Sequence, residues 1–151
     1  MSERDDQIES RTAGTTVAVD PGEVEFLRRY DASLYEKPSF TVDLVIFTVR
    51  EEHLHVLLVK RAEYPFKGCW ALPGGFLDPR RDASVDDCAA RKLVEETGVR
   101  APYLEQLKTY GSHDRDPRGW IATTVYFALM ASEAVRLQGN QEEARWVRVR
   151  G

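Results

Sequence analysis

The spacing of apolar and polar positions changes after residue 39, where short runs of apolar side chains begin. Residues 40–50 read FTVDLVIFTVR and residues 54–61 read LHVLLVKR, with the polar turn EEH between them. Runs rich in β-branched and aromatic side chains that flank a short polar turn predict a β-hairpin. Both runs are almost continuously apolar, which indicates strands that are buried on both faces.

A helix and further strands are predicted beyond this hairpin. Residues 62–75 are rich in Pro, Gly and aromatic side chains, which is typical of a long shaped loop. Asp82 or Ser84 can cap a helix that runs to Thr97, and Gly98 suits the left-handed residue that ends such a helix. The further strands are expected at residues 102–111, 121–131 and 144–150. This order predicts an α+β fold, or an α/β/α sandwich around a mixed sheet.

The first 39 residues differ in composition from the rest of the chain. Residues 1–22 carry few large apolar side chains among many charges, so they cannot offset the entropy of ordering and are expected to form a flexible tail. Residues 23–39 are expected to form an N-terminal arm that begins with a short helix, Glu23–Tyr30. The arm either docks, pairs with another subunit, or stays a loosely packed leader. Residues 40–151 are expected to form the one folded domain that this length allows.

Composition and charge exclude several classes of protein. Hydrophobic residues make up 42% of the chain and charged residues 30%, which excludes collagen-like and wholly disordered chains. The net charge of −4 gives no overall attraction to nucleic acid or to an anionic membrane. The 2 cysteines are too few for a disulfide framework and indicate a reduced, cytoplasmic protein. No apolar run approaches the roughly 20 residues that a membrane-spanning helix needs.

The segment 72–99, LPGGFLDPRRDASVDDCAARKLVEETGV, holds the residues most informative about chemistry. The adjacent carboxylates of Glu95 and Glu96 lie near the end of the predicted helix, after a glycine loop at residues 74–75. Mg²⁺ binds carboxylate oxygens together with phosphate oxygens and water, and glycine lets the backbone approach an ion closely. These residues favour a magnesium site, and an ordinary amphipathic helix with solvated charges is the alternative.

This segment resembles the Nudix box, G-x5-E-x7-R-E-U-x-E-E-x-G-U, in which U is apolar. Gly75 matches the opening glycine, Arg91 the arginine and Leu93 the apolar position. Residues 95–96 match the paired glutamates, and residues 98–99 match the close of the box. The sequence is therefore identified as resembling the Nudix hydrolase superfamily.

The resemblance extends over roughly residues 25–149 and includes PFKGCWALPGGF and RDPRGW. In these segments the chain is similar to the ADP-ribose pyrophosphatases and to the nicotinamide-related transcriptional regulators, whose Nudix domain senses ADP-ribose. The resemblance implies a single domain with the Nudix fold, which cleaves the pyrophosphate of ADP-ribose or a related nucleoside diphosphate-X with Mg²⁺ or Mn²⁺. The alternative it implies is a catalytically inactive ADP-ribose-sensing domain of a regulator of NAD metabolism.

Two departures from the box bear on activity. The box has extra residues between Gly75 and Arg91, so its first glutamate aligns with Ala83. The glutamate expected directly after the arginine is Lys92. An ammonium at this position is expected to pair with Glu96, four residues on, which would occupy a metal ligand and repel the ion. We therefore expect weak hydrolytic activity, and both departures also favour the sensing alternative.

Candidate site residues follow from the resemblance and from the chemistry of the side chains. The resemblance implies that the catalytic candidates are Glu95, Glu96 and Arg91, and that the metal ligands are Glu95, Glu96 and the Gly74 carbonyl. The substrate-binding candidates are Arg61, Phe66, Gly75, Arg115, Arg118 and Asp43. The alternatives are a solvated strand end for Arg61, ion pairs within their loop for Arg115 and Arg118, an internal anchor for Asp43, and core packing for Phe66.

The regulators that this chain resembles carry a winged-helix DNA-binding part after their Nudix domain. This chain stops at Gly151, before such a part or a closing helix. We therefore expect DNA binding only if a C-terminal part is missing from the chain. The expected partner is ADP-ribose or a related nucleotide, and the resemblance implies a homodimer.

Overall fold

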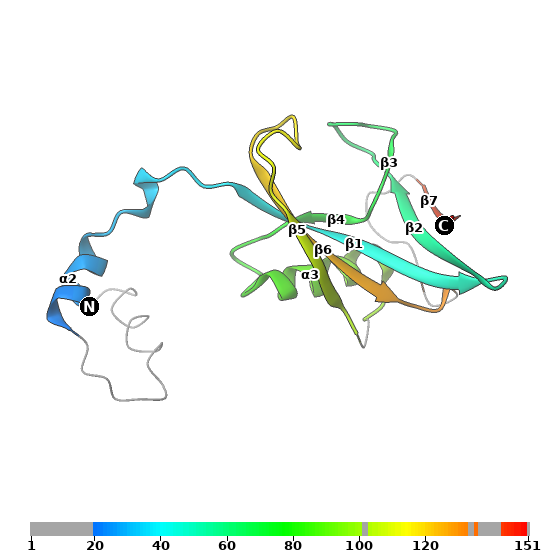
Figure 1. Cartoon of the computed structure of the whole chain (residues 1–151), viewed down its shortest axis with the longest axis horizontal. Helices are drawn as coiled ribbons and strands as arrows, with labels where there is room; N and C mark the ends of the chain where they lie inside the picture. Colours follow the sequence, from blue (N-terminus) through cyan, green and yellow to red (C-terminus); the bar gives the residue numbers. More distant parts are fainter. Residues whose placement is uncertain (1–19, 101–102, 133–134, 136–142, 151) are drawn as a thin grey trace. The chain divides into compact units, whose positions relative to one another are not determined.

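The computed structural model describes residues 20–100, 103–132, 135 and 143–150. The chain divides into two compact units, Met1–Lys37 and Pro38–Gly151, which are described separately (Figure 1). Within the described residues, no helix combines the length and the apolar character that crossing a bilayer requires.

The described part of the first unit, from residue 20 on, contains two short helices, α2 at Pro21–Arg29 and the 3₁₀ helix η1 at Ala32–Leu34. The Asp20 carboxylate caps α2 by accepting a hydrogen bond from the Gly22 amide at 2.8 Å. The helix was expected to begin at Glu23. It begins two residues earlier, at Pro21, because proline suits the first turn of a helix. The predicted flexible tail, residues 1–22, lies outside the described residues apart from this helix start.

In the described part of the second unit, one mixed sheet contains β1 Ser39–Arg50, β2 His53–Lys60, β3 Trp70–Ala71, β4 Gly74–Phe76, β5 Glu105–Tyr110, β6 Ile121–Leu129 and β7 Ala144–Arg148. The strand order is β3-β2-β1-β6-β5, with β4 paired to β1 and β7 to β2. Strands β1 and β6 run parallel, and the other pairs are antiparallel. Strand β1 is central because β6 pairs along one edge while β4 and β2 share the other.

The predicted β-hairpin is confirmed. Val49 of β1 lies opposite Leu54 of β2, and the turn residues Glu51 and Glu52 have φ angles of 50° and 62°. Two left-handed residues give the twist that joins two adjacent antiparallel strands. The loop predicted at residues 62–75 differs from the structure, because it holds β3 and the start of β4. These very short strands form by pairing with β2 and β1, which lie far away in the sequence.

The predicted central helix is confirmed as α3, Val85–Thr97. It begins after Ser84, whose hydroxyl accepts a hydrogen bond from the Asp87 amide at 3.1 Å. It ends at Gly98, which has a φ angle of 70° and therefore occupies the left-handed conformation that ends helices.

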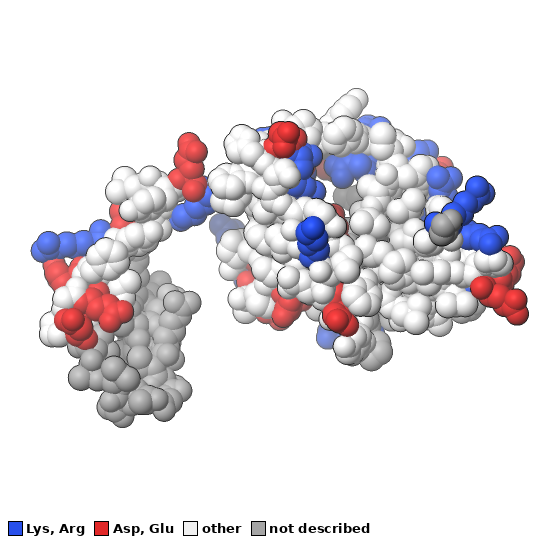
Figure 2. Space-filling model, in the orientation of Figure 1, with Lys and Arg blue, Asp and Glu red and all other residues white. Residues whose placement is uncertain are grey.

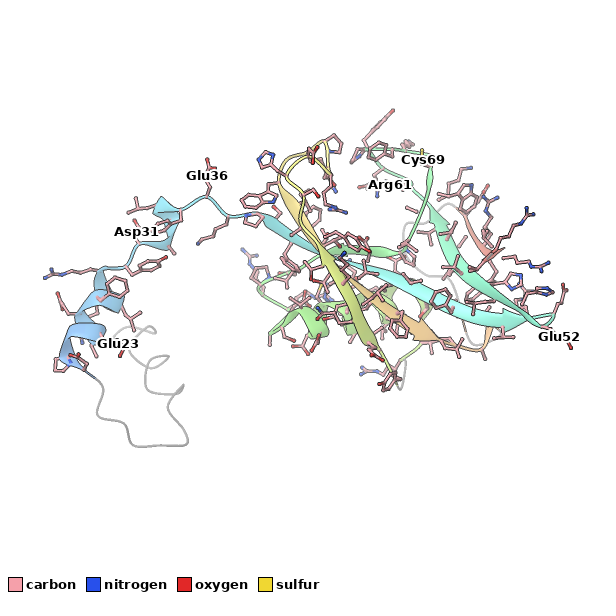
Figure 3. The ribbon with its side chains drawn as sticks, viewed as in Figure 1. Glu23, Asp31, Glu36, Glu52, Arg61 and Cys69 are labelled. Carbon is pink, nitrogen blue, oxygen red and sulfur yellow. The ribbon has the colours of Figure 1, made fainter. Side chains whose placement is uncertain are left out.

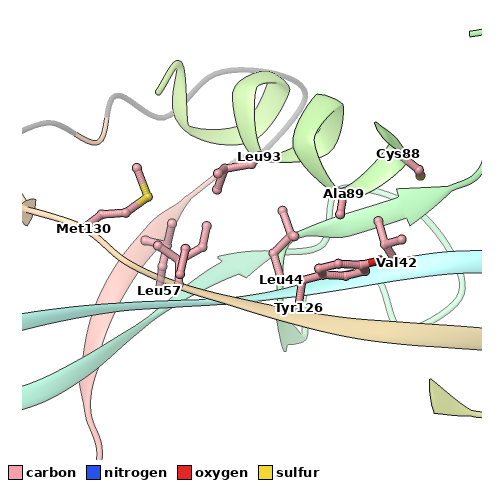
Figure 4. Close-up of a cluster of buried hydrophobic side chains, with 10 residues drawn as sticks. Val42, Leu44, Leu57, Cys88, Ala89, Leu93, Tyr126 and Met130 are labelled. Carbon is pink, nitrogen blue, oxygen red and sulfur yellow. The ribbon is translucent and has the colours of Figure 1, made fainter. Parts of the chain in front are cut away.

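The hydrophobic core of the second unit lies between α3 and one face of the sheet (Figure 4). Ala89 and Leu93 of α3 pack in a cluster with Leu44 of β1, Leu57 of β2 and Tyr126 of β6. Helix α3 also contacts β4, so the packing of the core places the helix beside the glycine loop. The predicted α+β fold with a mixed sheet is confirmed, and α3 supplies the helical layer that the described residues place on this sheet.

Candidate functional site

A cavity of about 520 Å³ lies beside the glycine loop of the second unit. Its walls come from β1, from the loop between β2 and β3, from β4, and from the loop between β5 and β6. Figure 2 shows Lys and Arg side chains in blue at the hollow between these two loops, and Figure 3 labels Arg61 and Cys69 on the first loop. The cavity brings together the predicted metal ligand Gly74 and every predicted substrate-binding residue: Arg61, Phe66, Gly75, Arg115, Arg118 and Asp43.

The glycine loop lies against β1, because Gly74 pairs with Asp43 across the sheet. A Cβ atom on Gly74 would lie 2.2 Å from the carbonyl oxygen of Val42 and 3.0 Å from the Asp43 Cα. A Cβ atom on Gly75 would instead lie 2.6 Å from the Cε atom and 2.9 Å from the Nζ atom of Lys92. Glycine at the first position therefore allows two backbones to meet, and glycine at the second allows the Lys92 side chain to lie over the loop.

Asp43 places a carboxyl group in the cavity wall from the central strand β1. Its Oδ2 atom accepts a hydrogen bond from the Thr123 hydroxyl at 2.8 Å. Burial raises the pKa of Asp43, while the hydrogen bond from Thr123 and the charges of Arg115 and Arg61 oppose this rise. The Asp43 carboxyl thus accepts one hydrogen bond and lies in the field of two arginines. These surroundings suit both roles considered for it, an internal anchor and an acceptor of hydrogen bonds from ligand hydroxyl groups.

Arg61 and Arg115 come from the two loops that flank the cavity, and the backbone orients both. The Arg61 Nε atom donates to the Pro65 carbonyl at 2.7 Å, and an Arg115 terminal nitrogen donates to the Ile121 carbonyl at 2.9 Å. A guanidinium group carries five N–H donors in a rigid plane. One backbone bond therefore fixes the direction of each group and leaves it capacity to bind an anion such as a phosphate.

Arg118 lies at the cavity but is held within its own loop. Its guanidinium donates to the Asp116 carboxylate at 2.9 and 2.8 Å, and it lies 5.1 Å from the centre of the Phe76 ring. The hydrogen bonds from Arg118 lower the pKa of Asp116 to about 2. The ion pair within the loop, which was the alternative for Arg118, is therefore present, whereas the hydrogen bond of Arg115 goes to a strand carbonyl.

Three aromatic residues line the cavity, Phe66, Trp70 and Phe76. Phe66 is 60% exposed, so the core packing considered for it is absent, and its φ angle of 60° belongs to a tight turn. Trp70 lies under the guanidinium of Arg145, 3.9 Å from the ring centre. Thr41 of β1 lines the cavity but was not among the predicted site residues, because only the pairing of β1 with the very short strand β4 forms this wall.

Arg91 of α3 fixes the segment that precedes the helix. It donates from Nε to Asp82 Oδ1 and from a terminal nitrogen to Asp82 Oδ2, both at 2.6 Å. These hydrogen bonds hold the pKa of Asp82 far below its ordinary value and raise the pKa of Arg91. Because both side chains are largely buried, the pair joins the segment before α3 to the middle of the helix.

Glu95 is surrounded by cations. Its carboxylate lies 3.1 Å from Arg81, 3.2 Å from Arg91 and 3.0 Å from the ammonium of Lys92. Burial alone would raise the pKa of Glu95, but the hydrogen bonds from Lys92 and Arg91 outweigh that effect and lower it. The ion pair of Lys92 was expected with Glu96, and the structure shows it with Glu95, three residues on.

The predicted catalytic residues lie outside the lining of the cavity. Glu96 is only 8% exposed, and Glu95 and Arg91 line a second cavity of about 520 Å³, beside α3. No group of three or more His, Cys, Asp or Glu residues in the described part of the chain could hold a metal ion. A magnesium ion can be held by one or two carboxylates with water and phosphate oxygens, so the metal-binding role of Gly74, Glu95 and Glu96 stays a prediction.

The glycine loop, the helix that follows it and the mixed sheet define a Nudix protein, and the chain belongs to the Nudix family. The NUDIX domain family matches residues 38–150, which confirms the resemblance seen in the sequence and agrees with the folded unit at Pro38–Gly151.

Among known proteins, the chain is similar to the ADPR responsive transcriptional repressor NtrR of Acinetobacter baylyi, with 47% identity over 83% of this chain and 50% of the repressor. It is also 35% identical to an ADP-ribose pyrophosphatase of Methanocaldococcus jannaschii, over 80% of this chain and 66% of the enzyme. The NUDIX domain of Shewanella oneidensis NrtR, solved with ADP ribose, superimposes with a TM-score of 0.75 and 43% identity, covering 83% of this chain and 82% of that one. The chain thus spans about half the length of the repressor.

Proposed function

We propose that this chain binds ADP-ribose, or a related nucleoside diphosphate-X, in the cavity and cleaves its pyrophosphate slowly. One observation supports this most: a glycine loop, two oriented arginines and a half-buried carboxyl line the same cavity. Guanidinium groups bind phosphate oxygens, and a carboxylate accepts hydrogen bonds from hydroxyl groups. ADP-ribose joins a diphosphate to ribose hydroxyls, so its chemistry complements this set of side chains.

Each predicted substrate-binding residue has a role in this proposal. Arg61 and Arg115 bind the diphosphate, and Gly75 lets it approach the backbone. Asp43 accepts a hydrogen bond from a ribose hydroxyl, and Phe66 offers an aromatic face to the adenine. Arg118 closes the site from its loop, where its bonds to Asp116 limit its movement. The names of the relatives, which include an ADPR responsive repressor and an ADP-ribose pyrophosphatase, support the choice of nucleotide.

Slow cleavage follows from the charges around Glu95. Nudix hydrolases generally use divalent metals, which neutralise a diphosphate and activate water. The resemblance assigns such an ion to Gly74, Glu95 and Glu96, but the Glu95 carboxylate already has cations at 3.0 to 3.2 Å. Binding of Mg²⁺ or Mn²⁺ there competes with Lys92 and with two arginines. The loss of a metal position lowers turnover more than it lowers affinity for the nucleotide.

The second candidate is a domain that senses ADP-ribose without cleaving it, as part of a regulator of NAD metabolism. The Lys92–Glu95 pair favours it, and so does the 47% identity to a transcriptional repressor that responds to ADPR. In this case the nucleotide is an effector, and DNA binding belongs to a part outside this chain. The homodimer implied by the resemblance stays a prediction for both candidates, which light scattering tests.

Two measurements test these proposals. Calorimetry with ADP-ribose is expected to give saturable binding, and Arg61→Ala is expected to weaken it about tenfold or more because a charged hydrogen bond is lost. Arg50→Ala is the matched control, since Arg50 is an exposed arginine at the far end of β1 that does not line the cavity. AMP release with Mg²⁺ or Mn²⁺ then separates the candidates. Turnover above that of Glu96→Gln supports the hydrolase, and turnover equal to it supports the sensor.

A further inference from the structure

The end of the Lys92 side chain lies against Gly75, a residue that lines the cavity, although Lys92 itself is not part of the lining. Its Nζ atom is 3.0 Å from a Glu95 oxygen, and the end of the side chain covers Gly75, where a Cβ atom would be 2.6 Å from Cε and 2.9 Å from Nζ. Gly75 itself lines the cavity. Lys92 is therefore directed from α3 across the helix edge onto the glycine loop, with a side chain that is 19% exposed.

The ion pairs around Lys92 leave a net positive charge beside the glycine loop. Glu95 is shared among Lys92, Arg81 and Arg91, and Arg91 is also paired with Asp82. This cluster contains three cations and two carboxylates, so it carries a net positive charge beside the glycine loop. An ammonium has three donors, of which one faces Glu95, so Lys92 retains the capacity to donate to an anion in the cavity.

We infer that Lys92 binds the diphosphate of the ligand directly, at the place where a Nudix enzyme would use a metal ion, and that nucleotide binding by this chain needs no divalent metal. This inference rests on the proposed function and specifies how the charge of the diphosphate is neutralised. Glu95 orients the ammonium, and the absence of a side chain at Gly75 lets the ammonium reach the ligand. Arg61, from the loop after β2, adds a second cationic group to the same cavity.

The first test uses the unmodified chain. Its dissociation constant for ADP-ribose is measured by calorimetry in EDTA and again with excess Mg²⁺. We expect the two values to agree within about twofold, because Lys92 supplies the charge. Loss of binding in EDTA with recovery in Mg²⁺ would overturn the inference while leaving the proposed function intact. The absence of binding in both buffers would overturn both. This test needs no variant and is independent of any effect on folding.

The second test changes the charge of the side chain. In EDTA, Lys92→Met is expected to weaken ADP-ribose binding by about 10- to 100-fold, the effect of losing a charged hydrogen bond, and Lys92→Arg to retain most of the affinity. Lys108→Met is the matched control, because Lys108 lies on β5, with its ammonium 5.3 Å from the centre of the Tyr110 ring, and does not line the cavity. If Lys92→Met binds as tightly as the unmodified chain, the residue only orients Glu95 and the inference is wrong.

Reversal of the charge gives a result that a purely structural role would not produce. Lys92→Glu restores an acidic group next to Glu95 and removes the ammonium. Its binding of ADP-ribose is expected to be weak in EDTA and to recover when Mg²⁺ or Mn²⁺ is added. Binding by Lys92→Glu that is equally weak in both buffers, in a variant whose circular dichroism shows a native fold, would contradict the exchange of a lysine for a metal.

Discussion

The two adjacent glycines of the loop allow a sharp prediction, because an added methyl group meets different neighbours at each. In Gly74→Ala, the new Cβ atom would lie 2.2 Å from the carbonyl oxygen of Val42, well inside van der Waals contact. This oxygen belongs to the central strand, and the backbone around it is held by a hydrogen bond from the Leu44 amide to the Pro73 carbonyl at 2.8 Å. Neither partner can move without breaking the pairing of β1 with β4.

The expected cost of Gly74→Ala is therefore at the upper end of the range for overpacked cores, about 3 kcal/mol in the free energy of unfolding. For a folded unit the size of Pro38–Gly151, that corresponds to a fall of roughly 12 °C in melting temperature. In Gly75→Ala, the Cβ atom meets only the end of the Lys92 side chain, which can rotate away. This variant is expected to lose under about 1 kcal/mol of stability, but to weaken ADP-ribose binding because it displaces Lys92.

Urea denaturation and thermal melting of the two variants, measured beside the unmodified chain, provide the test. The reasoning requires Gly74→Ala to be clearly less stable than Gly75→Ala. Equal stabilities for both variants would refute the claim that the glycine loop is set by contact with the β1 backbone.

Other predictions concern the core, the loop between β5 and β6, and the half-buried carboxyl of Asp43. Leu93→Ala removes a side chain that is 1% exposed and is expected to lower the free energy of unfolding by about 2–5 kcal/mol in urea titrations. Asp116 has a pKa lowered from 3.8 to about 2, so its stabilisation is complete above pH 3.8 and disappears as the pH falls through about 2. Asp116→Asn is expected to flatten this part of the curve of stability against pH, and an unchanged curve would contradict it. Thr123→Val removes the hydrogen bond that opposes the effect of burial on Asp43, so the pH at which acid affects ADP-ribose binding should rise; an unchanged pH profile would argue against a ligand contact of Asp43.

Local patterns predicted those elements whose stabilising interactions lie close together in the sequence. The hairpin of β1 and β2 follows from two apolar runs and a short turn. The bounds of α3 follow from Ser84 and Gly98, because caps are interactions within a few residues. Strands β3 and β4 could not be predicted in this way. They are too short to show a pattern, and their hydrogen bonds go to strands that are distant in the sequence.

The candidate site was predicted in part. The resemblance picked out residues such as Arg61 and Arg115 that share one cavity, although nothing in their spacing indicates that they meet. The predicted ion-pair partner of Lys92 was Glu96, and the structure shows Glu95. Residues three and four positions further along a helix lie on the same face, so the spacing alone did not distinguish the two. The structure shows the ammonium with Glu95, beside Gly75, and the neighbours that determine this arrangement come from another strand.

The central claim is that this cavity binds ADP-ribose, with its diphosphate between the glycine loop and the arginines. A crystal structure of the chain grown with ADP-ribose and Mn²⁺ tests this most directly, since Mn²⁺ is readily located by its anomalous scattering. We predict that the diphosphate lies within hydrogen-bonding distance of Lys92 and Arg61, with no Mn²⁺ bound at Glu95. A nucleotide bound outside the cavity would contradict the central claim, and a manganese ion held by Glu95 and Glu96 with Lys92 turned away would contradict the role of Lys92.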